Sequence, residues 1–417
     1  MATWFADSFG FEEASYEETR RRFTCTLGSG GRSAGGEARR GAGEGGACIV
    51  LTSDANQRSF HVGAFSTPSV AELRATVPAG GGGGDGEGEA GSCRGITFAN
   101  MSGDARSLHL DKRNAGAVFQ VASQFNLLEM VGPGVRPQDG ITRYSSDKTQ
   151  GPVCAMACPA GTVYRNYFWN GVGQGPAQFD GAGDIAKLVE NAKHGYWTMR
   201  NGYMLPTKMG VLDGLNSRFE SDEHASVPYN NNSATSSSNG GASKSTNSLS
   251  MPLRDAVVAS LRVGIHWDVE VERSRRDPER VPHHVCQVYS SAVPVNYTKT
   301  VATSKQWAPL ASAVLEGTFE AVLSAGAILS QQRSGERVKV FLTCVGGGAF
   351  GNRSLWIANA MEMALTRFKK YPLDVFLVHY MRNVTQATNP FVKIEHKFGG
   401  KKKKGRKKLN PKASSKK

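Results

Sequence analysis

Hydrophobic and polar positions follow two different periods along this chain. Apolar residues recur every three or four positions in some segments, which predicts amphipathic helices. In others they alternate or form short runs of β-branched and aromatic residues, which predicts strands. The helices are expected at 67–77, 184–192, 252–263, 305–332 and 355–368. The strands are expected at 47–52, 59–66, 117–125, 264–271, 285–295, 337–345 and 373–380, and segments 137–144 and 149–158 are helical or turn-like.

The order of these elements indicates the fold class. The last four alternate helix, strand, helix, strand, and the strand at 373–380 is apolar enough to be buried on both faces. Parallel strands need a crossover connection, usually a helix, so this alternation favours parallel pairing. We therefore predict an α/β fold with a mixed, largely parallel central sheet flanked by helices.

Three inserts and a tail interrupt the pattern. Residues 27–46, 79–91 and 223–250 are rich in glycine, serine or asparagine and almost free of apolar residues. Such segments bury too little apolar surface to offset their ordering entropy, which predicts disorder. The organisation expected is one α/β domain over 1–395 with these disordered inserts, followed by a basic disordered tail over 396–417.

The positive charge of the chain lies mainly in that tail. The net charge is +14, and residues 401–417 hold ten Lys and Arg and no acidic residue, which leaves +4 (14 minus 10) for the rest. A run of lysines without aromatic residues predicts non-specific nucleic acid contact or a nuclear address, and a solubilising tail explains it nearly as well.

Cysteine usage and hydropathy favour a cytoplasmic or nuclear location. The seven cysteines form no CxxC pair, which indicates reduced, mostly buried thiols. Residues 1–18 are acidic, unlike a signal or transit peptide, and no uncharged apolar run reaches the roughly 20 residues of a membrane span. We expect no membrane association, no metal site and no cofactor.

A glycine loop between strand 337–345 and helix 355–368 is the strongest candidate binding site. It comprises Gly346, Gly347, Gly348, Ala349, Phe350, Gly351 and Asn352. Without Cβ atoms the main chain can bring its amides to an anion, and the following helix N-terminus adds favourable partial charge. Asn352 or Ser354 is expected to cap that helix. The loop lacks the Lys-Ser/Thr of a P-loop and is not GxGxxG. A structural turn is the alternative.

Other segments carry candidate chemistry of lower specificity. The polar stretch 126–150 follows a strand, where α/β sheets place their sites, and a solvated loop is the alternative. Residues 164–171 are aromatic and amide-rich, which suits core packing or an adenine pocket. In strand 264–271, His266, Asp268 and Glu270 share one face and Ile265 and Val269 the other. That face is expected to be half-exposed and charged, with acid–base chemistry or cation binding as the alternative.

Two stretches resemble a known family. "LTCVGGGAFGNRSLWIANAMEMAL" (342–365) resembles the second phosphate loop of macrodomain proteins near poly(ADP-ribose) glycohydrolase, and Ala349 to Gly351 carry the likeness. "NAGAVFQVASQFNLLEM" (114–130) resembles the macrodomain strand with an asparagine near the ligand ribose. The resemblance implies a macrodomain-like fold, the diphosphate at residues 346–352, the ribose at Asn126, and acidic chemistry near Glu129.

The function expected is therefore binding of ADP-ribose, an ADP-ribosylated substrate or a related nucleotide. Hydrolysis of an ADP-ribosyl bond would add a carboxylate beside the anomeric carbon, for which Glu129, Asp139 and Asp268 are the candidates. Whether the chain is an enzyme, an ADP-ribosyl glycohydrolase, stays open. The alternative is a non-catalytic scaffold or nucleic-acid-associated protein that acts through its Lys-rich tail.

Overall fold

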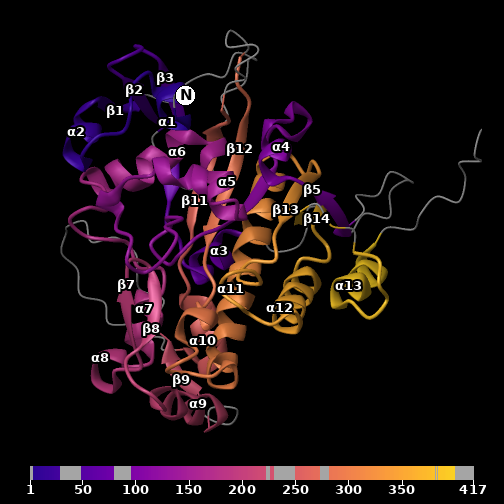
Figure 1. The fold of residues 1–417 in the computed structure, drawn as a ribbon. Coiled ribbons are helices and arrows are strands. Elements are labelled where there is room, and N and C mark those ends of the chain that lie inside the picture. Colours follow the sequence, from indigo (N-terminus) through magenta and orange to yellow (C-terminus); the bar gives the residue numbers. More distant parts are fainter. Residues whose placement is uncertain are drawn as a thin grey trace, which may run out of the picture.

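The protein is described from a computed structural model, shown in Figure 1. The structure describes residues 3–28, 48–78, 95–221, 226–229, 249–272, 281–380, 382 and 384–399. Residues 400–417 of the basic tail and most of the three inserts named above lie outside these residues, so their expected disorder stays a prediction. Residues 396–398, which were assigned to the tail, belong to a helix, α13 (Pro390–Phe398).

A seven-stranded sheet forms the centre of the molecule. Its strand order is β4, β11, β12, β6, β13, β14, β5. These are β4 (Phe65–Ser66), β11 (Gly264–Glu270), β12 (His284–Ser290), β6 (Val118–Ala122), β13 (Val338–Leu342), β14 (Leu373–Tyr380) and β5 (Thr97–Gly103). The five strands from β12 to β5 are parallel, whereas β11 runs antiparallel to both β12 and β4. The prediction of a mixed, largely parallel sheet flanked by helices is confirmed.

One face of this sheet is covered by helices around α11 (Ser304–Gln332), the long helix at the centre of Figure 1. By length and composition α11 alone among the described helices could cross a membrane, yet 94% of its most apolar window is buried inside the fold. It is the core helix of this layer. The helices packed around it or beside it are α3 (Val70–Thr76), α7 (Gly183–Leu188), α10 (Leu253–Ser260), α12 (Ser354–Arg367) and α13 (Pro390–Phe398).

The other face carries short helices and a second, smaller sheet. The helices are α4 (Ala105–Leu110), α5 (Gln150–Ala157), α6 (Pro159–Val163) and a π-helix at Tyr164–Phe168. The chain begins with α1 (Trp4–Phe9), α2 (Tyr16–Arg21) and the antiparallel sheet β1 (Phe23–Gly28), β2 (Cys48–Ser53), β3 (Ser59–Gly63). Interlocking aromatic rings fill the space beneath them, and Phe5, Phe9 and Phe23 contact one another edge-on.

The remaining elements lie at the lower end of the view in Figure 1. They are α8 (Asn191–His194), the hairpin β7 (Trp197–Arg200) and β8 (Tyr203–Pro206), α9 (Val211–Ser221) and the pair β9 (Ser226–Tyr229) and β10 (Leu249–Pro252). The sequence pattern did not predict these hairpins, nor β1, β5, α4 and α13.

The expectation for strand 373–380 is wrong. Buried and half-buried positions alternate along β14, so only one face is fully covered. The buried residues Val375 and Leu377 face α11, whereas Phe376 and Val378 on the other face of the strand are only partly buried.

The expectation of a half-exposed charged face on strand 264–271 is confirmed for Asp268, whose side chain is 44% exposed, and is wrong for His266 and Glu270. A bulge between His266 and Val269 breaks the alternation, and both side chains point at Gly161 in α6. His266 is fully buried and Glu270 is 6% exposed. A bulge inserts one residue into a strand and turns the side chains beyond it to the other face, which alternation alone does not reveal.

Candidate functional site

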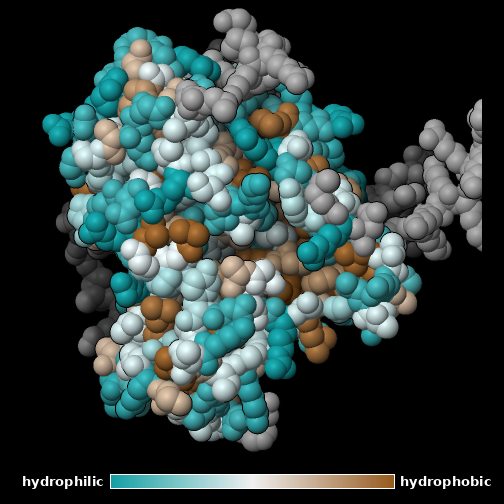
Figure 2. Space-filling model, viewed as in Figure 1, coloured by the Kyte–Doolittle hydropathy of each residue, from teal (hydrophilic) through white to brown (hydrophobic). Residues whose placement is uncertain are grey.

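A cavity of about 1110 Å³ opens at the carboxyl ends of the parallel strands. Its wall includes residues that directly follow three of them, Asp104 after β5, Ser123 after β6 and Thr343 after β13, and Arg382, two positions after β14. Ligands of α/β sheets bind at this edge. The space-filling view shows this face hollowed near its middle, with hydrophobic surface inside the hollow (Figure 2).

The glycine loop forms one wall of the cavity. Gly346, with a φ of 74°, begins a tight turn that a side chain would strain, since its Cβ would lie 2.5 Å from that of Ala292. Asn352 closes the turn. Its Nδ2 donates to the carbonyl of Val293 at 2.9 Å, and its own amide donates to the carbonyl of Gly346 at 2.9 Å. These two hydrogen bonds, one within the loop and one to Val293, fix the conformation of the loop.

The tip of this loop offers main-chain donors. The amides of Gly348, Ala349 and Phe350 donate to no other residue within the described part of the chain. All three residues line the cavity. A Cβ built on Gly348 meets nothing within 4 Å, so this position faces open space. Free amides at a glycine tip are suited to an anionic group such as a phosphate.

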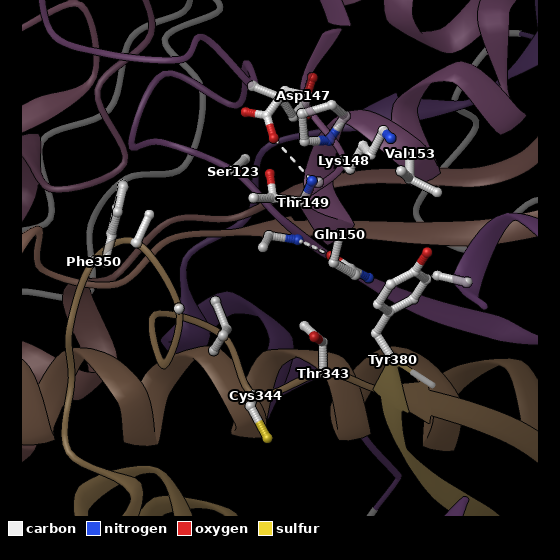
Figure 3. A pocket seen from close by; sticks show the side chains of 18 of the residues that line it. Ser123, Asp147, Lys148, Thr149, Gln150, Val153, Thr343, Cys344, Phe350 and Tyr380 are labelled. Atoms are coloured by element: carbon white, nitrogen blue, oxygen red, sulfur yellow. Dashed lines mark hydrogen bonds between the residues drawn. The ribbon is translucent and has the colours of Figure 1, made fainter. Parts of the chain in front are cut away.

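The opposite wall is the segment from Asp147 to Val153, which leads into α5 (Figure 3). Gly151 lies so close to β6 that a Cβ would approach the carbonyl of Ala122 to 2.0 Å. The side-chain amide of Gln150 bonds to the main chain of β6 as a neighbouring strand would: it accepts from the amide of Ala122 and donates to the carbonyl of Gln120. The first turn of α5 consequently faces the cavity, and the amides of Gln150 and Gly151 have no partner inside the helix, whereas Pro152 has no N–H and Val153 donates to Thr149.

Aromatic rings gather at the end of the cavity marked by Phe350, and Tyr380 lies at the other end (Figure 3). The rings of Tyr203, Tyr297 and Phe350 have centroids 5.1 to 5.6 Å apart. The hydroxyl of Tyr203 donates to the carbonyl of Met130 at 2.7 Å, which fixes that ring. A planar base fits against such a group of rings.

Three basic side chains at the cavity, Arg143, Lys148 and Arg382, form no ion pair with the described residues. Arg143 and Lys148 precede α5, and Arg382 follows β14. All three are exposed, so their charges are available to an anion at the rim. Sequence reasoning named Arg143 only as part of a polar stretch and missed the other two, since isolated basic residues in loops give no signal.

Glu129 lies in the wall of the same cavity, but its carboxylate is covered. Its side chain is fully buried, and its Oε1 lies 3.3 Å from the equally buried Nη2 of Arg165. Burial raises the pKa of Glu129 to about 7, against the opposing effect of Arg165 and of the hydrogen bond with Tyr144. Desolvation therefore outweighs the ion pair, and the carboxyl group is poised to change charge near neutral pH.

Arg165 is the centre of the buried network behind that wall. Its Nε donates to the carbonyl of Leu127 at 2.9 Å, and its guanidinium lies 3.5 Å from the ring centroid of Tyr289. Nη1 lies 3.3 Å from Nε2 of His266, which must accept, since arginine only donates. Burial and the nearby guanidinium lower the pKa of His266 well below its usual value, so this imidazole is neutral.

The structure does not bring the other predicted residues to the cavity. Asn126 is fully buried beside it and engaged internally, since its Nδ2 donates to Gln178 and its Oδ1 accepts from the amide of Leu128. Asp139 pairs with Arg136 on the surface. Asp268 lies on β11 beside the start of β12, at the end of the strands opposite the cavity. Of the predicted carboxylates, only Glu129 is part of the cavity wall.

The expected helix cap is wrong. The N-cap of α12 is Arg353, which makes no side-chain cap, and Ser354 is already helical. Asn352 bonds within the loop instead. Phe350 is the last residue of the glycine loop that lines the cavity, and no residue of α12 lines it. The helix N-terminus that does face the cavity belongs to α5, a segment that the sequence analysis predicted only as helical or turn-like.

Of the two roles considered for the aromatic segment 164–171, the structure supports core packing and not an adenine pocket. Asn166 and Tyr167 in the π-helix are fully buried, and no residue of the segment lines the cavity. The six cysteines within the described residues are free thiols, of which Cys154, Cys158 and Cys286 are buried, in agreement with the expected reduced state.

No protein-family model and no curated protein matches the sequence. The chain is similar to solved structures of poly(ADP-ribose) glycohydrolase. That from Thermomonospora curvata is 12% identical, with 80% of this chain and 85% of that chain covered and a TM-score of 0.35. That from Deinococcus radiodurans in complex with ADP-ribose is 11% identical, with 80% and 93% covered and a TM-score of 0.36. These are structures of the family that residues 342–365 resemble. A likeness this distant says nothing of the ligand, which is argued below from the cavity.

Proposed function

We propose that the cavity binds ADP-ribose or a closely related nucleotide. The observation that carries this proposal is the pair of facing walls. The free amides of Gly348, Ala349 and Phe350 stand on one side and the first turn of α5 on the other. A diphosphate between them receives main-chain hydrogen bonds from both sides, and Lys148 adds positive charge.

The size and the ends of the cavity agree with a nucleotide. Pockets for drug-sized ligands measure roughly 300–1,000 Å³, and this one reaches about 1110 Å³. The rings of Tyr203, Tyr297 and Phe350 offer a base a stacking surface at one end. The residues after β6, Ser123 and Gln124, supply polar groups to the cavity wall between the ends. Asn126 as the ribose contact stays a prediction, because its amide is engaged beside the cavity.

Hydrolysis of an ADP-ribosyl bond is a second candidate function, and Glu129 favours it. A carboxyl group with a pKa near 7 in a cavity wall is suited to proton transfer. Against it stands the complete burial of the side chain behind Gly151. To reach a substrate the carboxyl group must leave Arg165. Binding is therefore the function that the geometry supports best.

Binding is tested by calorimetric titration of the full chain with ADP-ribose, ADP and AMP. We expect one site with ADP-ribose, and weaker binding of AMP because it lacks the diphosphate. Gly348→Glu should abolish binding by placing a negative charge among the amides, while the matched Gly348→Gln should retain part of it. Gly348 is preferred to Gly347, whose Cβ would approach Ile357 to 2.9 Å. No heat at millimolar ADP-ribose refutes the proposal.

Two further measurements separate the alternatives. Removal of residues 401–417 should leave ADP-ribose binding unchanged, and loss of all binding would favour the tail as the site. Release of ADP-ribose from an ADP-ribosylated protein tests hydrolysis. If Glu129→Gln abolishes release while ADP-ribose still binds, Glu129 acts in catalysis; if the wild-type chain releases none, it binds without hydrolysis.

A further inference from the structure

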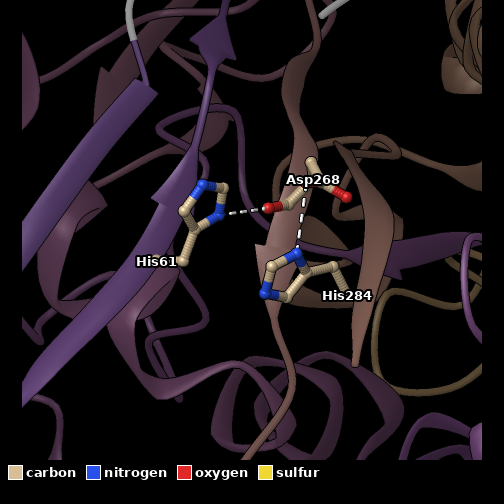
Figure 4. A group of neighbouring side chains, drawn as sticks. All are labelled: His61, Asp268 and His284. Carbon is tan, nitrogen blue, oxygen red and sulfur yellow. Dashed lines mark hydrogen bonds and ion pairs between the residues drawn. The ribbon is translucent and has the colours of Figure 1, made fainter. Parts of the chain in front are cut away.

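Three strands bring two histidines and a carboxylate together at the edge of the sheet opposite the cavity. They are His61 on β3, Asp268 on β11 and His284 at the start of β12 (Figure 4). Each offers one ligand atom, and all of these atoms lie within 4.8 Å of one another. The side chains are half-buried, so an ion in solution can reach them. His61 is 207 residues from Asp268, which is why the sequence showed no metal-ligand spacing.

The donor atoms converge on Asp268. Nδ1 of His61 lies 2.9 Å from the main-chain oxygen of Asp268, and Nδ1 of His284 lies 3.1 Å from its Oδ2. The two imidazole rings are stacked, with centroids 4.7 Å apart and planes within 2° of parallel. Both Nδ1 atoms face Asp268, that of His61 its main-chain oxygen and that of His284 its carboxylate (Figure 4).

We propose that His61, Asp268 and His284 bind a divalent transition-metal ion of the zinc class. Two imidazoles and a carboxylate are a donor set that zinc accepts, whereas calcium and magnesium prefer oxygen ligands throughout. Ligand atoms about 2.0–2.1 Å from a tetrahedral ion lie roughly 3.3 Å from each other. The present separations, at most 4.8 Å, close to that value by small side-chain rotations.

Cys48 on β2 supports His61 from behind. Its Sγ lies 2.7 Å from Nε2 of His61, on the side of the ring away from Asp268. A metal-binding histidine usually has its other nitrogen held by a second residue, which fixes the tautomer and the ring orientation. Without an ion, Nδ1 of His61 carries the proton, because the main-chain oxygen of Asp268 at 2.9 Å can only accept. Binding of an ion at Nδ1 therefore requires that this proton move to Nε2, where the sulfur of Cys48 can accept it. Glu270 adds to this by accepting the main-chain amide of His61 at 3.0 Å.

The position indicates a structural role. His61 belongs to the small sheet β1–β2–β3, whereas Asp268 and His284 belong to the central sheet. An ion here joins the two sheets. The cavity lies at the other end of β12, so this inference is independent of the proposed nucleotide binding.

The test is a zinc titration of the full chain, produced without a histidine tag and stripped with a chelator. A competing chromophoric chelator reports affinity, and elemental analysis reports stoichiometry. We expect one tightly bound zinc per chain and a higher unfolding temperature with zinc. His61→Ala and His284→Ala should weaken binding by roughly 100-fold or more, and Cys48→Ser by about tenfold, the cost of a supporting residue. His194→Ala, on α8, is the matched control and should change nothing.

Cobalt substitution and Asp268→Asn keep the test valid if a histidine variant fails to fold, as judged by circular dichroism. Cobalt should give the intense visible bands of a four-coordinate site, and Asp268→Asn should weaken or remove them. Absence of tight zinc in the wild-type chain overturns the proposal. So does an equal loss in His194→Ala and His61→Ala, or a cobalt spectrum typical of the hydrated ion.

Discussion

Replacing Glu129 with glutamine should flatten the pH dependence of stability. In the folded protein burial raises the pKa of Glu129 from 4.5 to about 7, and in the unfolded chain it returns to 4.5. A carboxyl group whose pKa is raised by folding is neutral in both states below its unfolded pKa, so its ionisation costs no stability there. As pH rises towards the folded pKa, the unfolded chain releases this proton more readily, so stability falls. Glutamine has no proton to release and resembles the neutral acid in shape.

The size of the effect follows from the two pKa values. The rise in pKa from 4.5 to about 7 corresponds to about 3 kcal/mol over the whole titration, at about 1.36 kcal/mol per pH unit. Most of it, about 2–3 kcal/mol, develops between about pH 5 and about pH 8. The wild-type chain should therefore lose about 2–3 kcal/mol more stability across this interval than Glu129→Gln.

Urea unfolding at several pH values between these limits measures the difference directly. Glu362→Gln is the control, because Glu362 forms only a surface ion pair with Lys397. Its pH dependence should follow that of the wild type. If the wild type and Glu129→Gln keep a constant difference across the interval, Glu129 is ionised throughout, and the dominance of desolvation over Arg165 is refuted.

Two further predictions concern the walls of the cavity. Gly346→Ala should lower the free energy of unfolding by about 1–3 kcal/mol, because φ is 74° and the new Cβ meets that of Ala292. Gly348→Ala, the control, should stay within about 0.5 kcal/mol of the wild type. Urea unfolding compares the two variants, and equal stability would contradict the turn geometry. Arg165→Met should cost about 3–5 kcal/mol at neutral pH by leaving Glu129 unpaired, and partial recovery in the double variant with Glu129→Gln would show the coupling, while strict additivity would exclude it.

Much of the fold was predictable because its signals are local. The apolar period of α11 depends on residues near in sequence, and the helix it predicts is confirmed. The capping box that Ser69 and Glu72 form at the start of α3, another predicted helix, is equally local. The run at β13 and the glycines after it likewise identified a strand and a turn. A prediction of which side chains share a face depends on strict alternation and fails where one residue is inserted, as at the bulge after His266 in β11.

The sequence by itself determined that a glycine loop follows a buried parallel strand, since positive φ and close approach are properties of the glycines themselves. Only the tertiary structure decided what faces this loop. The first turn of α5 forms the opposite wall because Gln150 and Gly151 pack against β6. The carboxylate of Glu129 is buried behind this wall, where it pairs with Arg165. His61 likewise meets Asp268 only through packing of two sheets. Contacts between distant segments depend on strand order and register, and no short stretch of sequence encodes these.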